Sequence, residues 1–235
     1  KDVPGKEKPF VLPNFQPEID RFELNATTGK INLTQRIKLT RPDGKALTGL
    51  PNLQAGAEGK AYTDEVPIDL FGNRLPNDPL GADLEGIAVA KDGTFWLADE
   101  YRPSIYHFDA NGKLIDRLIP KGSPTGDGTF GTPILPEVYA QRRSNRGFEG
   151  VAIDGDKVYA FMQSGLDNPD VVDDANSKAS GNLRIVEYDT KTKVVTGEYL
   201  YQLNDVKIAD KLGDATALGN GKFLVAERDS NATVD

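Results

Sequence analysis

The chain has 235 residues, of which 38% are hydrophobic and 27% charged, a composition that gives a globular domain enough apolar mass for a sizeable core. Its net charge of −8 argues against binding along a nucleic-acid backbone, and no stretch approaches the roughly 18 to 20 apolar residues of a membrane-spanning helix. Without cysteine, and with His107 as the only histidine, thiolate and multi-histidine zinc sites are excluded.

The 24 glycines and 15 prolines are spread along the chain, which favours many short strands joined by turns. The sequence begins at Lys1 and holds one methionine, Met162. Together with the absence of cysteine, this predicts a processed protein whose signal peptide has been removed and whose location is periplasmic or secreted.

The first elements follow in chain order. Residues 1–18 contain four prolines and predict an extended lead-in. Alternating apolar and polar residues over 19–39, interrupted by one turn, predict a hairpin. Residues 45–82 are polar with little periodicity and predict a long functional loop. Helix is expected only over 136–143 and 206–212.

A two-strand unit recurs further along. Residues 85–100 read EGIAVAKDGTFWLADE and residues 149–163 read EGVAIDGDKVYAFMQ, whereas 214–228 keeps the turn and second strand but lacks Glu-Gly. Hairpin patterns over 104–119 and 183–203 give each of the first two units four strands. This predicts an all-β fold, a β-propeller of four-stranded antiparallel blades. A β-sandwich or irregular barrel is the alternative.

Acidic side chains flank the repeated strands. Glu85 and Glu149 precede strands of small residues, which lie nearest the axis of a propeller. Carboxylates that converge on one pocket need a cation or raised pKa values, and oxygen-only ligands suit calcium best. Alternatively, each acid caps a turn or pairs with an arginine. The candidate metal ligands are Asp83, Glu85, Asp99, Glu100, Glu149 and Glu227.

Two arginines stand next to these acids. Arg146 lies in the basic run 142–147 just before Glu149, and Arg228 follows Glu227. Guanidinium groups bind phosphate in bidentate fashion, although a charged run is also typical of a solvated loop. A second acidic group, at residues 167–174, lacks the spacing of a calcium-binding loop and predicts an exposed loop.

Four sequence blocks resemble one known family: LGADLEGIA (80–88), DGTFWLADEY (92–101), NRGFEGVA (145–152) and FLVAERD (223–229). Together they resemble the phytase-like family described as having esterase-like activity, and the resemblance covers nearly the whole chain. It implies a propeller-like fold and a phosphoester hydrolase, often exported. It also implies that the six acids above are the active-site residues.

We therefore expect residues 1–235 to be one phytase-like propeller domain. At about 40 to 50 residues a blade the length supplies about five blades, and the family pattern continues beyond Asp229. Either the chain is incomplete at its C-terminus or the ring closes in an unusual way.

The expected function is a calcium-dependent hydrolase of phosphoesters at the mouth of the channel, acting on a small anionic substrate. Glu85, Glu100 and Glu149 would hold the ion, and Arg146 or Arg228 would orient the phosphate. Two alternatives remain: a non-catalytic propeller that binds a ligand or protein, and a lactonase-like hydrolase of carboxylic esters.

Overall fold

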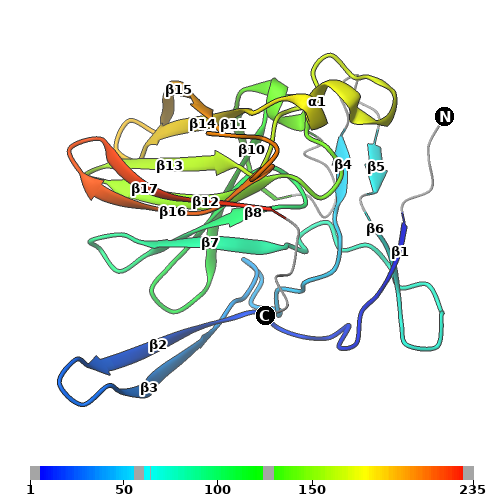
Figure 1. Ribbon diagram of the computed structural model, residues 1–235. Coiled ribbons are helices and arrows are strands. Elements are labelled where there is room, and N and C mark those ends of the chain that lie inside the picture. The colour runs from blue at the N-terminus through cyan, green and yellow to red at the C-terminus, as the bar shows by residue number, and fades with distance from the viewer. Residues whose placement is uncertain (1–5, 56–60, 64, 124–129, 230–235) are drawn as a thin grey trace.

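The computed structural model describes residues 6–55, 61–63, 65–123 and 130–229, and strands dominate it (Figure 1). The first six strands are β1 (Lys6–Pro9), β2 (Glu18–Asn25), β3 (Lys30–Lys38), β4 (Leu53–Ala55), β5 (Ala61–Thr63) and β6 (Glu65–Ile68). The next five are β7 (Leu84–Val89), β8 (Phe95–Asp99), β9 (Ser104–Phe108), β10 (Leu114–Pro120) and β11 (Thr132–Leu135). The last six are β12 (Phe148–Asp154), β13 (Lys157–Met162), β14 (Asn182–Asp189), β15 (Val194–Gln202), β16 (Lys211–Gly219) and β17 (Lys222–Arg228).

Each repeated sequence unit forms one blade of a propeller. Strands β7 to β10 are antiparallel neighbours in order, as are β12 to β15, and β16 pairs with β17 as the inner half of a third blade. The predicted all-β propeller is confirmed, rather than a sandwich or barrel. The first sheet has a fifth strand, because β11 adds to β10 in parallel, which the repeat pattern did not predict. The expectation of about five blades is not met in the described residues, since each complete unit uses about 64 residues with its loops.

The innermost strands β7, β12 and β16 lie side by side (Figure 1). A Cβ on Gly86 of β7 would stand 2.7 Å from the backbone nitrogen of Val151, and one on Gly150 of β12 would stand 2.9 Å from that of Ala215. The glycine of each Glu-Gly pair therefore allows two backbones to approach where the blades converge. This explains the repeated motif and places the preceding glutamates at the axis.

We expect Gly86→Ala to destabilise the fold by about 1–3 kcal/mol, because the added methyl group meets backbone atoms that cannot move aside. Gly49→Ala is the matched control, since no atom in the described part of the chain lies within 4 Å of its added Cβ, and it should change stability by less than about 0.5 kcal/mol. Urea unfolding of the two variants measures the difference. Equal stability of the two variants would contradict the close packing of β7 against β12.

Successive blades pack face to face through buried apolar side chains. One cluster joins the first blade to the second and includes Trp96, Leu118, Val158 and Met162, all less than 5% exposed. A second packs β3 against the first blade, and a third packs β16 and β17 against the second. This stacking holds the ends of the inner strands in fixed positions around the axis.

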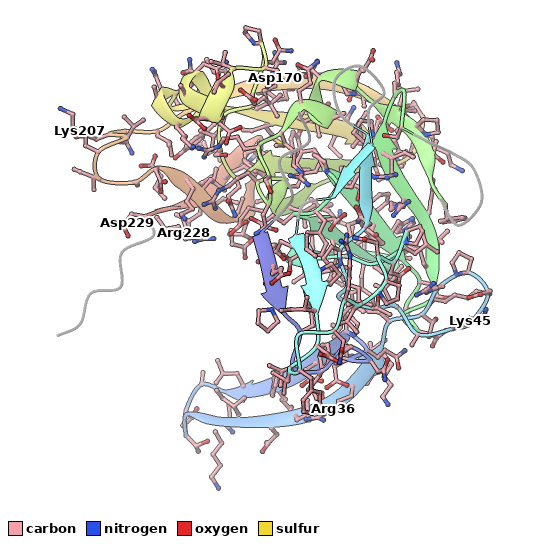
Figure 2. All side chains as sticks on the ribbon, turned by 90° about the vertical axis from the view of Figure 1, so that its right-hand side faces the viewer. Arg36, Lys45, Asp170, Lys207, Arg228 and Asp229 are labelled. Carbon is pink, nitrogen blue, oxygen red and sulfur yellow. The ribbon has the colours of Figure 1, made fainter. Side chains whose placement is uncertain are left out.

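Several elements outside the blades differ from the sequence prediction. The lead-in contains β1, which pairs in parallel with β6, while residues 1–5 lie outside the described part. The predicted hairpin is β2–β3, which projects from the blades (Figures 1 and 2). Residues 206–210 are not helical, and β16 begins at Lys211. The predicted helix over 136–143 is a 3-10 helix, η1 (Glu137–Gln141), and the acidic segment 167–174 leads through η2 (Val172–Asp174) into α1 (Ala175–Ala179).

Candidate functional site

A chain of backbone hydrogen bonds joins the ends of the repeated units. The Glu100 nitrogen donates to the Asp83 carbonyl at 2.9 Å, and the Gly147 nitrogen donates to the Glu100 carbonyl at 3.0 Å. The Gln163 nitrogen then donates to the Gly147 carbonyl at 2.9 Å, and the Leu212 nitrogen to the Gln163 carbonyl at 2.8 Å. These contacts bring the segments before β7, after β8 and after β13 to one place at the axis.

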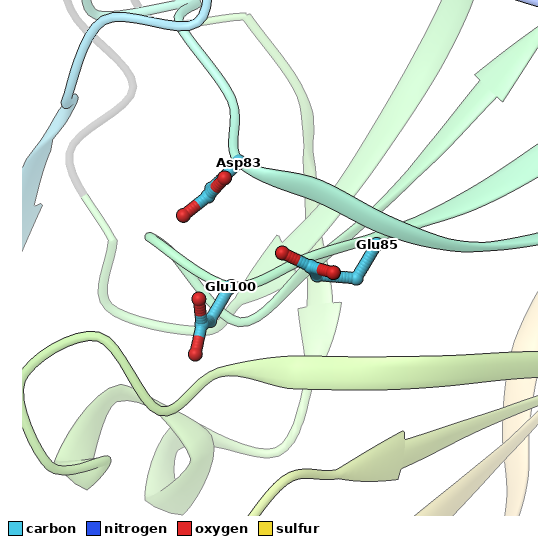
Figure 3. A group of neighbouring side chains, drawn as sticks. All are labelled: Asp83, Glu85 and Glu100. Atoms are coloured by element: carbon cyan, nitrogen blue, oxygen red, sulfur yellow. The ribbon is translucent and has the colours of Figure 1, made fainter. Parts of the chain in front are cut away.

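Three carboxylates meet there. Asp83 precedes β7, Glu85 lies in β7, and Glu100 follows β8; Figure 3 shows the three side chains reaching into the same space. One carboxylate oxygen of each lies within 4.8 Å of those of the other two. Glu100 is only 5% exposed, whereas Glu85 is the most exposed of the three. We call Asp83, Glu85 and Glu100 the acidic cluster.

The acidic cluster favours bound protons in the absence of a cation. The pKa of Glu100 is raised to about 8, mainly by burial and secondly by repulsion from Asp83 and Glu149. Partial burial, then repulsion from Glu149 and Asp83, raises the pKa of Glu85 to about 7. The pKa of Asp83 is also raised, chiefly by burial. Such shifts mark carboxylates that a positive ion would stabilise in their charged form.

A fourth carboxylate, that of Glu149, connects the acidic cluster to two arginines. Its carboxylate accepts hydrogen bonds from Arg228 and from the amide of Gln163. The same amide nitrogen donates to Glu100 Oε1 at 2.7 Å, and the amide oxygen accepts from Arg146. Figure 2 shows Arg228 at the end of β17, apart from Arg36 on the projecting hairpin. Acidic and basic groups therefore face one another across Gln163.

Of the three sequence-predicted ligands outside the acidic cluster, Glu149 adjoins it, whereas Asp99 and Glu227 do not. Asp99 is completely buried and accepts hydrogen bonds from Ser104 Oγ at 2.8 Å and from the backbone nitrogens of Asp83, Tyr101 and Arg102. Burial raises its pKa to about 7. The Glu227 carboxylate accepts from Tyr201 at 2.7 Å and from Asn204. Both acids fix turns and strands, the alternative that the sequence left open.

Sequence reasoning missed three neighbours of the site. Gln163 occupies the repeat position of Glu100, so the aligned repeats could have identified it. Nothing in the pattern marked Lys8, whose Nζ lies 2.9 Å from Glu65. Tyr101 ends one of the four family blocks but was given no role, and its hydroxyl donates to Glu65 at 3.3 Å. These contacts tie the β1–β6 pair to the turn that carries Glu100.

Other polar candidates lie outside this centre. His107 stacks on Trp96 with ring centroids 3.9 Å apart, and burial lowers its pKa, which fits a packing role. Asp167 was expected in an exposed loop but is only 8% exposed; its backbone nitrogen donates to the Gln141 carbonyl at 2.8 Å. Neither residue extends the acidic cluster.

The fold and the site together define an all-β propeller with a carboxylate-rich centre flanked by arginines. The family model described as "Phytase-like: Esterase-like activity of phytase" matches residues 14–235. The chain belongs to this phytase-like family, as the four sequence blocks suggested.

A curated relative is similar over most of the chain. It is an uncharacterized secreted protein of Arthroderma benhamiae, 28% identical over 239 residues, covering 86% of this chain and 46% of its own length. The chain thus spans about half the length of that relative. None of the helices in the described part of this chain has the length and apolar character needed to cross a bilayer.

Solved structures give more distant likenesses. A streptogramin B lyase is 14% identical with a TM-score of 0.35, covering 77% of this chain and 48% of its own. The Dos1 propeller is 11% identical with a TM-score of 0.27, covering 91% of this chain and 66% of its own. Because these TM-scores are below 0.5, the detailed blade assignment rests on the strand order of this chain.

Proposed function

We propose that the protein is a calcium-dependent hydrolase of small phosphoesters that acts at the axis of the propeller. The single observation that supports this most strongly is the placement of the acidic cluster next to Arg146 and Arg228, with Gln163 and Glu149 between them. A divalent cation fits the first group, and a substrate anion fits the second.

The acidic cluster has the chemistry and the spacing of a calcium site. Calcium takes oxygen ligands at about 2.3–2.6 Å, so two of its ligands lie at most about 5 Å apart. The three carboxylate oxygens lie within 4.8 Å of one another, which satisfies this limit. Asp83, Glu85 and Glu100 would hold the ion. Glu149, in β12 of the next blade, lies close enough for its charge to raise the pKa values of Glu85 and Glu100.

The arginines supply the binding site for the anionic group. Arg228 contacts Glu149 through one guanidinium nitrogen and remains 47% exposed at its side chain, so further donors are available to a phosphate. The ion pair with Glu149 raises the pKa of Arg228 and keeps its guanidinium oriented. Arg146, which donates to Gln163, adds a second positive charge from the segment before β12.

A carboxylate is the candidate proton acceptor. The raised pKa values of Glu85 and Glu100 belong to the metal-free site, because a bound cation favours the charged form of a carboxylate. Glu85, as the most exposed of the acidic cluster, can take a proton from an attacking water. A bound calcium ion would neutralise charge on the phosphoryl group and lower the pKa of that water.

We also infer that the protein is exported, to the periplasm or outside the cell. The absence of cysteine and the secreted relative support this location, in which calcium is abundant enough for a site of moderate affinity.

Release of nitrophenol from chromogenic phosphomonoesters and phosphodiesters tests the proposal, with calcium, with chelator, and in Glu85→Gln. We expect release only for the wild type with calcium. A preference for nitrophenyl carboxylic esters would point instead to a lactonase-like hydrolase. Background rates on every ester would overturn the hydrolase and favour a ligand-binding propeller.

The pH dependence of stability gives a second prediction. The raised pKa values of Glu85 and Glu100 mean that the folded state keeps protons that unfolded glutamates release near pH 4.5. The folded state then binds more protons than the unfolded state, so these groups lower stability as pH rises from about 4.5 to about 8. In chelator, the decrease in Tm from about pH 5 to about pH 8.5 should be smaller for Glu100→Gln than for the wild type. Parallel curves for the two proteins would contradict the raised pKa of Glu100.

A further inference from the structure

Gln163 is held rigidly between two repeated units. It follows β13 directly. Its backbone nitrogen donates a hydrogen bond to the Gly147 carbonyl, and its backbone carbonyl accepts one from the Leu212 nitrogen. Its side chain is also enclosed, since the residue is only 1% exposed. A buried amide in a fixed backbone has little freedom to choose other partners.

Among the described residues, the hydrogen bonds of this side-chain amide go to Glu100, Glu149 and Arg146. The two hydrogens of Gln163 Nε2 are donated to Glu100 Oε1, at 2.7 Å, and to Glu149 Oε2. The side-chain oxygen of Gln163 accepts a hydrogen bond from Arg146. The opposite orientation would set the amide oxygen against two carboxylates and the amide nitrogen against a guanidinium. The charges on both sides therefore fix which way the amide points.

The aligned repeats show where Gln163 stands in the charge pattern. The last residue of each unit is Glu100 in the first, Gln163 in the second and Arg228 in the third. Three matched positions thus carry an acid, a neutral amide and a base. The neutral one lies between the acidic cluster and the arginines.

We propose that Gln163 is a positioning residue of the cation site: it fixes the Glu100 carboxylate for the ion and limits the negative charge around it. This rests on the proposed function, because it assumes that the acidic cluster binds calcium. Glutamine provides the two donors without adding a further carboxylate beside Glu100 and Glu149. A glutamate of the same shape would add a negative charge beside Glu100 and Glu149, which a bound cation offsets. A leucine would remove the amide donor of Glu100 and leave Glu149 with Arg228.

Calcium binding by Gln163→Glu and Gln163→Leu, measured by isothermal titration with calcium chloride, tests the proposal. Both variants should have a lower Tm than the wild type in chelator. Their calcium affinities should change in opposite directions: at least tenfold tighter for Gln163→Glu and at least tenfold weaker for Gln163→Leu. Gln202→Glu, which adds the same charge at an exposed position of β15, is the matched control and should match the wild type.

A purely structural role would move both affinities in the same direction or leave both unchanged, and either result overturns the proposal while the calcium site stands. If the wild type itself binds no calcium, the proposed function fails and this inference fails with it. Should Gln163→Glu be unfolded in chelator, recovery of its circular dichroism on adding calcium supports the proposal, and persistent unfolding contradicts it. If Gln163→Leu does not fold, Gln163→Asn, which keeps the amide but shortens its reach, replaces it and should also bind calcium more weakly.

Discussion

Glu100→Gln should weaken calcium binding by at least about tenfold, equivalent to about 1.4 kcal/mol, and reduce ester hydrolysis in proportion. The substitution keeps the shape of the side chain and its contact with Gln163 but removes one of the three charges that face the ion. Isothermal titration with calcium chloride measures the affinity directly.

The same substitution should stabilise the metal-free protein at about pH 8 or above, because it removes repulsion among Glu100, Asp83 and Glu149. Opposite effects on calcium binding and on stability distinguish a ligand from a residue whose loss merely disturbs the fold. Glu227→Gln is the control: its carboxylate contacts Tyr201 and Asn204 and should leave calcium affinity unchanged. If Glu227→Gln weakened binding as much as Glu100→Gln, the assignment of the acidic cluster would be wrong.

Asp99→Ala should lower the free energy of unfolding by about 3 kcal/mol or more. The fully buried carboxylate accepts hydrogen bonds from Ser104 Oγ and from the backbone nitrogens of Asp83, Tyr101 and Arg102, and each buried donor left without a partner costs about 1–3 kcal/mol. These donors surround the turn that carries Glu100, so the acidic cluster depends on Asp99 without using it as a ligand.

Chemical denaturation measures this loss, with Asp109→Ala as the matched control. Asp109 also accepts two backbone hydrogen bonds at a turn, from Asn111 and Lys113, but in an exposed setting. Its replacement should lower stability by about 1 kcal/mol or less, because water can take the place of the carboxylate. Similar losses in the two variants would mean that Asp99 does not organise the turn.

The fold could be predicted where local sequence determines it. The Asp/Gly turns, the aromatic second strands and the Glu-Gly pairs recur at matched positions, so the β7–β8, β12–β13 and β16–β17 pairs follow from the pattern. The parallel pairing of β11 with β10 and of β1 with β6 could not, because parallel pairing across a connecting segment leaves no local periodicity. The short helix α1 also escaped prediction, since five residues contain too few turns to produce a periodic pattern.

The sequence predicted the types of residue in the candidate site, but it could not predict which of the candidate acids meet there. Proximity to the repeated strands identified Glu85, Glu100 and Glu149, and the structure places them around one axis. The same reasoning included Asp99 and Glu227, because successive side chains in a strand point to opposite faces and the sequence does not say which face meets the axis. It overlooked Gln163, because only charged residues were considered as carriers of chemistry.

Diffraction from crystals grown with calcium, recorded at a wavelength where calcium scatters anomalously, tests the central claim most directly. The account predicts one anomalous peak with carboxylate oxygens of Asp83, Glu85 and Glu100 at about 2.3–2.6 Å. A peak held by other residues, or no peak there at saturating calcium, would contradict it.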